Sequence, residues 1–187
     1  PQGSIMVFIE HHLGTVAMVS LELLCKARRL AAELGVEVTA VAMGHDMREP
    51  LTALKGYGCA RVYYVDDPRL AHFTAVPAAR VIVEIIRRHH PQFVLFGAST
   101  TGRAVAPRVA SELRCGLTAD CTDLQIGSDT FKSKTYDDIL LQIRPAFGGN
   151  VVATIVSPDC SPSMATVREG VMPLDAPDPS LPGSVVD

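Results

Sequence analysis

The fold is decided by one stretch of sequence, Phe93-Val94-Leu95-Phe96-Gly97-Ala98-Ser99-Thr100-Thr101-Gly102-Arg103. Its apolar residues are typical of a buried strand, its glycine and hydroxyl residues are typical of a turn, and a helical pattern begins near Arg103. A strand that passes through a tight turn into a helix is the building unit of α/β proteins. The N–H groups at the start of such a helix are unpaired and electropositive, which suits them to hold phosphate. The stretch therefore predicts both a fold class and a candidate binding turn.

The same alternation of strand and helix runs through the first 113 residues. Strands are expected at residues 5–9, 36–42, 61–65 and 93–96, and helices over residues 20–34, 48–57, 76–90 and 103–113. Consecutive strand–helix units form a parallel sheet, because each helix crosses back over the sheet. We therefore predict an α/β protein, a parallel Rossmann-like three-layer sandwich with helices on both faces.

The pattern changes in the C-terminal third. Residues 121–126, 131–136, 139–143 and 151–156 resemble strands, and the polar segments Gly127-Ser128-Asp129 and Asp137-Asp138 are interpreted as hairpin turns. An antiparallel β extension of the parallel sheet is expected here. Residues 1–172 are assigned to this single α/β domain.

Residues 173–187 contain four prolines, Pro173, Pro177, Pro179 and Pro182, together with acidic and small residues. Such a composition is typical of a linker or tail. We expect this segment to lead toward a further domain beyond Asp187. The alternative is the flexible end of a complete single-domain protein.

Composition excludes several classes of function. The net charge is −3 and the isoelectric point is near 6.1, so no nucleic-acid partner is expected. The five cysteines form no CxxC pair and no metal-ligand spacing, so no metal site is expected and the thiols are interpreted as reduced. No apolar stretch approaches the ~20 residues of a membrane span and no signal peptide is visible, which favours the cytoplasm and no membrane insertion. No catalytic constellation is recognisable.

The turn after residue 96 is the first candidate site. It lacks the glycine pattern of dinucleotide-binding turns and the lysine of the P-loop. Its hydroxyl and N–H groups would hold a nucleotide or flavin phosphate, and a guanidinium would add a fork-shaped cation. The candidate contacts are Gly97, Ser99, Thr100, Thr101, Gly102 and Arg103. The alternative is structural, with Thr100 or Thr101 capping the helix and Gly102 allowing close packing.

The second candidate site is the segment Arg144-Pro145-Ala146-Phe147-Gly148-Gly149-Asn150. Its proline removes a ladder donor, and its paired glycines allow another backbone to approach closely. An aromatic residue between them would be poorly covered in a monomer. We expect Arg144, Phe147, Gly148, Gly149 and Asn150 to face a partner or a cofactor, although an ordinary hairpin is the alternative.

Several segments, taken together, resemble the N-terminal domain of the electron transfer flavoprotein alpha subunit. They are residues 97–103 followed by Ala106-Pro107-Arg108, Gly116-Leu117-Thr118-Ala119-Asp120-Cys121-Thr122, residues 144–150, and Met164-Ala165-Thr166-Val167-Arg168-Glu169-Gly170-Val171-Met172. Val7-Phe8-Ile9-Glu10-His11 and Val19-Ser20-Leu21-Glu22-Leu23-Leu24 fit the opening of that domain. The resemblance extends from about Ile5 to Met172, and the combination is far more specific than any single motif.

The resemblance implies a fold of the adenine-nucleotide alpha-hydrolase type and a beta subunit of similar fold as partner. It implies that the heterodimer carries electrons from flavin dehydrogenases, such as acyl-CoA dehydrogenases, to a quinone reductase, or that it bifurcates the electrons of NADH. The expected location is the cytoplasm, or the mitochondrial matrix in a eukaryote. In the family, the redox-active FAD lies mainly on a C-terminal domain of the alpha subunit, which these 187 residues do not include. AMP or NAD(H) would be bound through the complex.

Three functions are therefore considered. The leading one is a scaffold that docks the beta subunit and shapes the environment of the flavin, with no catalytic residue of its own. The second is a stand-alone adenine-nucleotide-binding regulatory module built on the turn at Gly97. The third is an oligomerisation domain whose glycine segments only pack.

Overall fold

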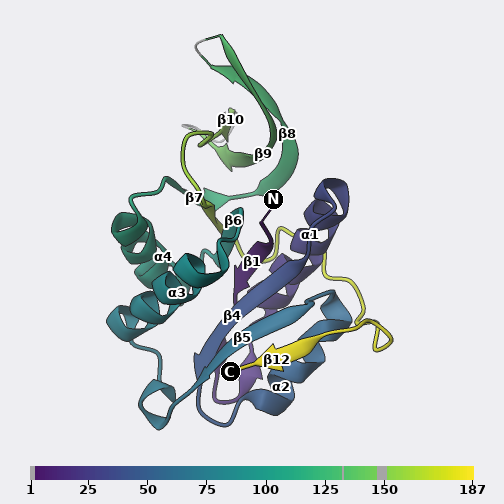
Figure 1. The fold of residues 1–187 in the computed structure, drawn as a ribbon, viewed down its shortest axis with the longest axis vertical. Helices are drawn as coiled ribbons and strands as arrows, with labels where there is room; N and C mark the ends of the chain where they lie inside the picture. The colour runs from purple at the N-terminus through teal and green to yellow at the C-terminus, as the bar shows by residue number, and fades with distance from the viewer. Residues whose placement is uncertain (1–2, 132, 147–150) are drawn as a thin grey trace.

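The computed structural model describes residues 3–131, 133–146 and 151–187. Its centre is a seven-stranded sheet in the order β12-β5-β4-β1-β6-β11-β7, in which every neighbouring pair is parallel (Figure 1). The strands are β12 (Ser184–Val186), β5 (Arg61–Asp66), β4 (Val38–Gly44), β1 (Ile5–Phe8), β6 (Phe93–Gly97), β11 (Ser163–Val167) and β7 (Leu117–Cys121). The predicted parallel α/β architecture is confirmed.

Helices cover both faces of the sheet. They are α1 (Met18–Leu34), α2 (Arg48–Thr52), α3 (Ala75–His89) and α4 (Thr100–Leu113), and short 3-10 turns lie at Ala53–Tyr57 and Pro68–Leu70. Figure 1 shows α3 and α4 together on one side, away from α1 and α2. In the described ranges, no helix is long and apolar enough to cross a membrane.

The two-residue period of the central strand divides the core in two. Ile5 and Val7 point into a core shared with α1 and α2, whereas Met6 and Phe8 point into a core shared with α3 and α4. All four side chains are buried, because the parallel strand is covered on both faces. The apolar run that predicted this strand thus also accounts for the three layers.

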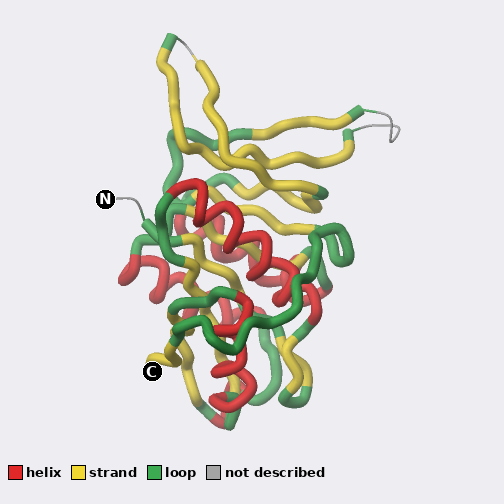
Figure 2. The backbone as a smooth tube through the Cα atoms, turned by 90° about the vertical axis from the view of Figure 1, so that its right-hand side faces the viewer, coloured by secondary structure: helices red, strands yellow, loops and turns green. Residues whose placement is uncertain are grey.

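An antiparallel arm extends from the β7 edge of the body (Figures 1 and 2). Its strands are β8 (Asp123–Phe131), β9 (Lys134–Pro145) and β10 (Val152–Ile155), in the order β10-β9-β8. The predicted antiparallel extension is confirmed. A small separate hairpin, β2 (His11–His12) with β3 (Thr15–Val16), follows the central strand.

The two predicted hairpin turns of the arm are wrong. Gly127-Ser128-Asp129 lies within β8 and Asp137-Asp138 lies within β9, opposite one another in one long hairpin. The register shifts between Gly127 and Asp129, where Gly127 pairs with Ile139 and Asp129 pairs with Tyr136. The extra residue on β9 is accommodated as a bulge, and Asp138 there has a φ of 57°. The turn-forming residues of both segments therefore lie at an irregularity within the β8–β9 hairpin and not at its end.

Strand β11 was not predicted, although it is buried throughout. After β7 the chain leaves the body, forms the arm, and returns between β6 and β7, where β11 pairs in parallel with both. Its sequence, Ser-Met-Ala-Thr-Val, has neither a long apolar run nor a strict alternation. Its place in the sheet depends on partners that are distant in sequence.

The segment 173–187 is held against the body by several contacts. Asp175 forms ion pairs with Arg28 and Arg29 of α1, at 3.0 and 2.8 Å, and the Asp178 N–H donates to the Gly56 carbonyl oxygen at 2.8 Å. The segment then ends in β12, which extends the sheet beside β5. The predicted linker or tail thus lies extended along the body and ends in an edge strand, both of which proline-rich chain allows. That a further domain follows stays a prediction.

Gln142 in the arm offers a test of the packing at its base. Its side chain is fully buried, and neither its amide nitrogen nor its amide oxygen has a hydrogen-bond partner in the described part of the chain. An unpaired buried amide costs stability. The variant Gln142→Leu is expected to raise the free energy of unfolding by about 1–3 kcal/mol in urea titrations. Gln125→Leu, at an exposed position of β8, should bring no gain; an equal gain would contradict the explanation.

Candidate functional site

The carboxyl ends of the parallel strands meet at one edge of the sheet. Next to β1 the strand order reverses, because β4 lies on one side of it and β6 on the other. Ligand sites of open α/β sheets lie outside the strands at this reversal point. Three segments with polar side chains meet this edge: Glu10 after β1, the turn after β6, and Arg168 after β11.

The turn at 97–103 is held by its own contacts. The Ser99 Oγ caps α4 by accepting the Gly102 N–H at 3.0 Å. Gly102 lies against the strand so closely that an added Cβ atom would stand 1.8 Å from the Gly97 carbonyl oxygen. The structural alternative from the sequence is thus observed, with Ser99 and not Thr100 or Thr101 as the capping residue.

A buried carboxyl group faces this turn. Glu10 is 7% exposed, and its Oε2 accepts a hydrogen bond from the Ser99 hydroxyl at 2.6 Å. Burial raises the pKa of Glu10, the hydrogen bond from Ser99 lowers it, and the charge of Glu169 raises it further. An acidic group therefore lies beside the α4 N-terminus, where the sequence predicts a phosphate. A nucleotide contact by residues 97–103 stays a prediction.

Sequence reasoning missed Glu10. The signal that could have found it is its position directly after the central strand, at the carboxyl edge of the sheet. The residue that donates a hydrogen bond to it, Ser99, lies in the loop after β6, far along the chain. The contact between them depends on β1 and β6 being neighbours, which the order of elements alone does not determine.

Arg103 lies close to the carboxylate of Asp120, and Arg144, from the other predicted segment, lies near enough for its charge to act on the ionisation of that group. Asp120 accepts hydrogen bonds from Arg168 Nε at 3.2 Å and Nη2 at 2.7 Å, and the Arg103 Nη2 lies 3.5 Å from Asp120 Oδ1. The hydrogen bonds from Arg168 hold the pKa of Asp120 below its usual value, and the charges of Arg168, Arg103 and Arg144 act in the same direction. We call these four residues the arginine cluster.

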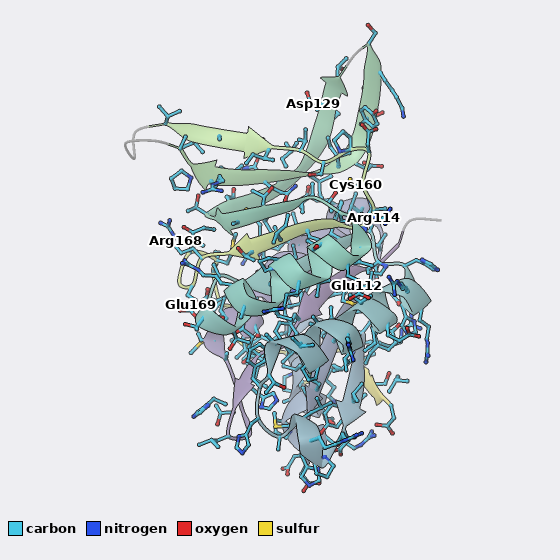
Figure 3. All side chains as sticks on the ribbon, turned by 90° about the vertical axis from the view of Figure 1, so that its left-hand side faces the viewer. Glu112, Arg114, Asp129, Cys160, Arg168 and Glu169 are labelled. Carbon is cyan, nitrogen blue, oxygen red and sulfur yellow. The ribbon has the colours of Figure 1, made fainter. Side chains whose placement is uncertain are left out.

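The arginine cluster carries excess positive charge, since it contains three guanidinium groups and one carboxylate, and Arg168 and Arg103 contact that carboxylate. The side chains of Arg103 and Arg168 are 64% and 48% exposed, so an anionic group from outside can reach them. Figure 3 shows Arg168 and Glu169 where the chain leaves β11, at the opposite end of the sheet from Cys160 and Arg114. Guanidinium groups in such an array are suited to bind carboxylates or phosphates.

Part of the second predicted segment cannot be placed. Phe147, Gly148, Gly149 and Asn150 lie outside the described residues, so their partner-facing role stays a prediction. Arg144 is placed near the end of β9, at the base of the arm. Strand β9 therefore belongs to the arm and also carries Arg144, a member of the arginine cluster.

Two buried thiols of the described chain are not activated. Burial raises the pKa of Cys121 to about 11 and that of Cys59 to about 12, so both remain protonated thiols at neutral pH. His45, Asp46 and Asp66 approach one another, but all three are exposed.

Comparison with known proteins agrees with the resemblance found in the sequence. The electron transfer flavoprotein domain family matches residues 5–187. An electron transfer flavoprotein subunit alpha from Thermoanaerobacterium thermosaccharolyticum is 42% identical over 182 residues, which cover 97% of this chain and 53% of the relative. One from Megasphaera elsdenii is 40% identical over 183 residues, with coverages of 98% and 52%.

A further relative has a different name. A subunit of lactate dehydrogenase (NAD(+),ferredoxin) from Acetobacterium woodii is 43% identical over 164 residues, which cover 88% of this chain and 37% of the relative. The chain spans about half the length of the two alpha subunits that it matches. From the family match and these identities, the chain belongs to the electron transfer flavoprotein family.

Proposed function

We propose that this chain is the N-terminal domain of an electron transfer flavoprotein alpha subunit, which docks a beta-type subunit and shapes the surroundings of the flavin. The observation that carries the proposal is the arginine cluster, in which Arg103 and Arg168 contact Asp120 and Arg144 comes from the base of the arm. An exposed array with excess positive charge fits an acidic surface or a cofactor phosphate on the partner. The arm offers a second surface, since Val152 is 63% exposed.

FAD is the cofactor that we propose for the complex, and it would supply the one-electron and two-electron chemistry. The residues of this chain would act on it from a distance. The guanidinium groups of Arg103 and Arg168 would stabilise negative charge on the partner's surface or on a cofactor phosphate. Neither group has a proton to exchange near neutral pH, so their contribution is electrostatic.

Two branches of this function differ in electron donor. In one, the complex accepts electrons from flavin dehydrogenases of the acyl-CoA dehydrogenase type and passes them to a quinone reductase. In the other, it bifurcates the electrons of NADH. The name of the Acetobacterium woodii relative includes NAD(+) and ferredoxin, which favours the second branch. Anaerobic bleaching of the flavin by NADH, with no dehydrogenase present, would distinguish them.

A stand-alone adenine-nucleotide module has less support. The place beside the α4 N-terminus is taken by the carboxyl group of Glu10, and a phosphate there would meet an acidic neighbour. AMP or NAD(H) would then be bound through the complex and not by this domain alone.

The docking role is tested in the full-length alpha chain produced together with its beta-type subunit. We expect a yellow complex, and we expect the double variant Arg103→Glu/Arg168→Glu to slow association by at least about tenfold at low salt. The difference should shrink as salt rises, because exposed charges are screened. Association rates are measured by surface plasmon resonance.

Arg80→Glu is the matched control, since it reverses an exposed arginine on α3, on a different part of the surface. It should leave the association rate close to that of the parent. A stable, colourless monomer that ignores the beta-type subunit would contradict the proposed function. An unchanged rate in the double variant would remove the arginine cluster from it.

A further inference from the structure

A second group of polar side chains lies at the carboxyl edge of the sheet, on the other side of β1 from the arginine cluster. Strands β4 and β5 run side by side in parallel and end together, with Gly44 paired opposite Asp66 (Figure 1). His45 and Asp46 come directly after β4, and Asp66 is the last residue of β5. The two strand ends therefore bring the three side chains together, and we call them the histidine–aspartate cluster.

The imidazole ring of this cluster lies between two carboxylates. His45 Nδ1 is 3.2 Å from Asp66 Oδ1, and His45 Nε2 is 3.4 Å from Asp46 Oδ2. The oxygens of an ionised carboxylate only accept, whereas a neutral imidazole has a single N–H group. A neutral ring therefore leaves one of the two contacts without a hydrogen between its atoms. Either a second proton on the ring or a metal ion at that nitrogen would complete the contact.

The charges of the cluster suit a divalent cation. With a neutral ring, the three side chains together carry two negative charges. In the described part of the chain, neither Asp46 nor Asp66 forms an ion pair with a lysine or an arginine. The neighbouring Asp67 is already paired with Arg69, at 2.6 Å. One divalent ion would balance the two carboxylates that have no such partner.

Asp66 is positioned by groups beyond the cluster itself. Burial raises its pKa, but hydrogen bonds from His45, the Asp46 N–H group and the Tyr64 hydroxyl group hold the pKa below the usual aspartate value. Tyr64 is buried, and its hydroxyl oxygen accepts the Met47 N–H at 2.9 Å. Supporting hydrogen bonds of this kind orient the ligands of metal sites. The Asp66 carboxylate is therefore ionised and held in place from the core.

The spacing of the donor atoms fits an ion of the zinc type. Ligands about 2.0–2.1 Å from a tetrahedral ion lie about 3.3–3.4 Å apart, close to the 3.2 Å between His45 Nδ1 and Asp66 Oδ1. Asp46 offers an oxygen within 4.8 Å of ligand atoms from both other residues, and its side chain is 85% exposed, so it can rotate toward them. One imidazole nitrogen with two carboxylate oxygens suits zinc and similar transition metals better than calcium or magnesium, which prefer oxygen ligands alone.

We propose that His45, Asp46 and Asp66 bind one divalent transition-metal ion of the zinc type, with water in the remaining coordination position. The ion would join the segment after β4 to the end of β5. The prediction from the sequence that no metal site is present was based on the spacing of the cysteines, and this cluster contains none. The proposal does not depend on the docking role of the arginine cluster.

The test uses the untagged full-length alpha chain in complex with its beta-type subunit, with zinc chloride as the probe and magnesium chloride for comparison. Calorimetry should show zinc binding with a dissociation constant of about 0.1 mM or below, and much weaker binding of magnesium. The variants His45→Gln and Asp66→Asn each remove one ligand at a position that is 42% exposed, and each should weaken zinc binding at least about tenfold. Cobalt chloride provides a second readout, because its visible absorption at this site should be lost in both variants.

The matched controls are His12→Gln, at an exposed histidine of β2, and Asp129→Asn, at an exposed aspartate of β8. Both should bind zinc like the parent, and circular dichroism should show that all four variants keep the fold. Three results would each overturn the proposal. They are no zinc binding in this concentration range, equal zinc binding by the parent and by both ligand variants, and magnesium binding as tightly as zinc.

Discussion

The variant Gly102→Ala is expected to lose about 3 kcal/mol or more of its free energy of unfolding, and to be largely unfolded if the parent is only marginally stable. The added Cβ atom would stand 1.8 Å from the Gly97 carbonyl oxygen and 3.3 Å from Glu10 Oε1. The first of these neighbours is backbone of the central sheet, so it cannot move aside as a flexible side chain would. Relief requires α4 to shift away from β6, which separates well-packed side chains.

Urea denaturation followed by circular dichroism measures this loss. The control is Ser111→Ala at an exposed position of the same helix, which should change stability by less than about 0.5 kcal/mol. Alanine is the better helix former of glycine and alanine, by about 1 kcal/mol. A Gly102→Ala variant that gained this amount would show that the close approach of α4 to β6 is not needed.

The variant Glu10→Gln is expected to be more stable than the parent at neutral pH, by about 1.4 kcal/mol for every unit by which folding raises the pKa of Glu10. Burial is the main cause of that rise. Because the folded chain holds this proton more tightly than the unfolded chain, stability falls as pH increases between the unfolded and the folded pKa. The cost is complete above the folded pKa, and it is absent below the usual glutamate value of 4.5.

The advantage of Glu10→Gln should therefore be largest at neutral pH and should vanish as pH falls below about 4. Urea titrations of both proteins across this range measure it, with Glu33→Gln as the exposed control. Equal stability of the parent and Glu10→Gln at every pH would show that the carboxyl group is not held in a costly environment. An advantage confined to acidic pH would reverse the sign and contradict the burial argument.

The alternation of strands and helices was predictable because local patterns of apolar, glycine and polar residues indicate each element. The runs at 93–97 and 5–8 are apolar at consecutive positions, as strands buried on both faces require. The turn at 97–103 was recognisable from its glycines, and its structural alternative was stated from the same residues. Local chemistry, however, assigned the cap to the wrong hydroxyl, since the cap position depends on where the helix begins.

What could not be predicted depends on contacts between distant segments. β11 owes its place to β6 and β7, and the Asp137-Asp138 segment became a bulge because its partner strand continued past it. The contact of Arg103 and Arg168 with one carboxylate required the positions of β6, β7 and β11 together. Glu10 was likewise not predicted as a site residue, since the hydroxyl group that donates to it belongs to Ser99, in a different strand–helix unit.

The insertion of β11 between β6 and β7 sets an order of events during biosynthesis. A ribosome makes the strands β1, β4, β5 and β6 first, then β7 and the whole arm, and only afterwards residues 163–167. Until those residues emerge, the inner side of β6 presents unpaired N–H and C=O groups to the surroundings. A nascent chain arrested within the arm would therefore expose an open sheet edge, and such edges pair readily with other chains. A released chain that ends between residues 123 and 160 should therefore be a client of chaperones, while a released chain that includes residues 163–167 should not.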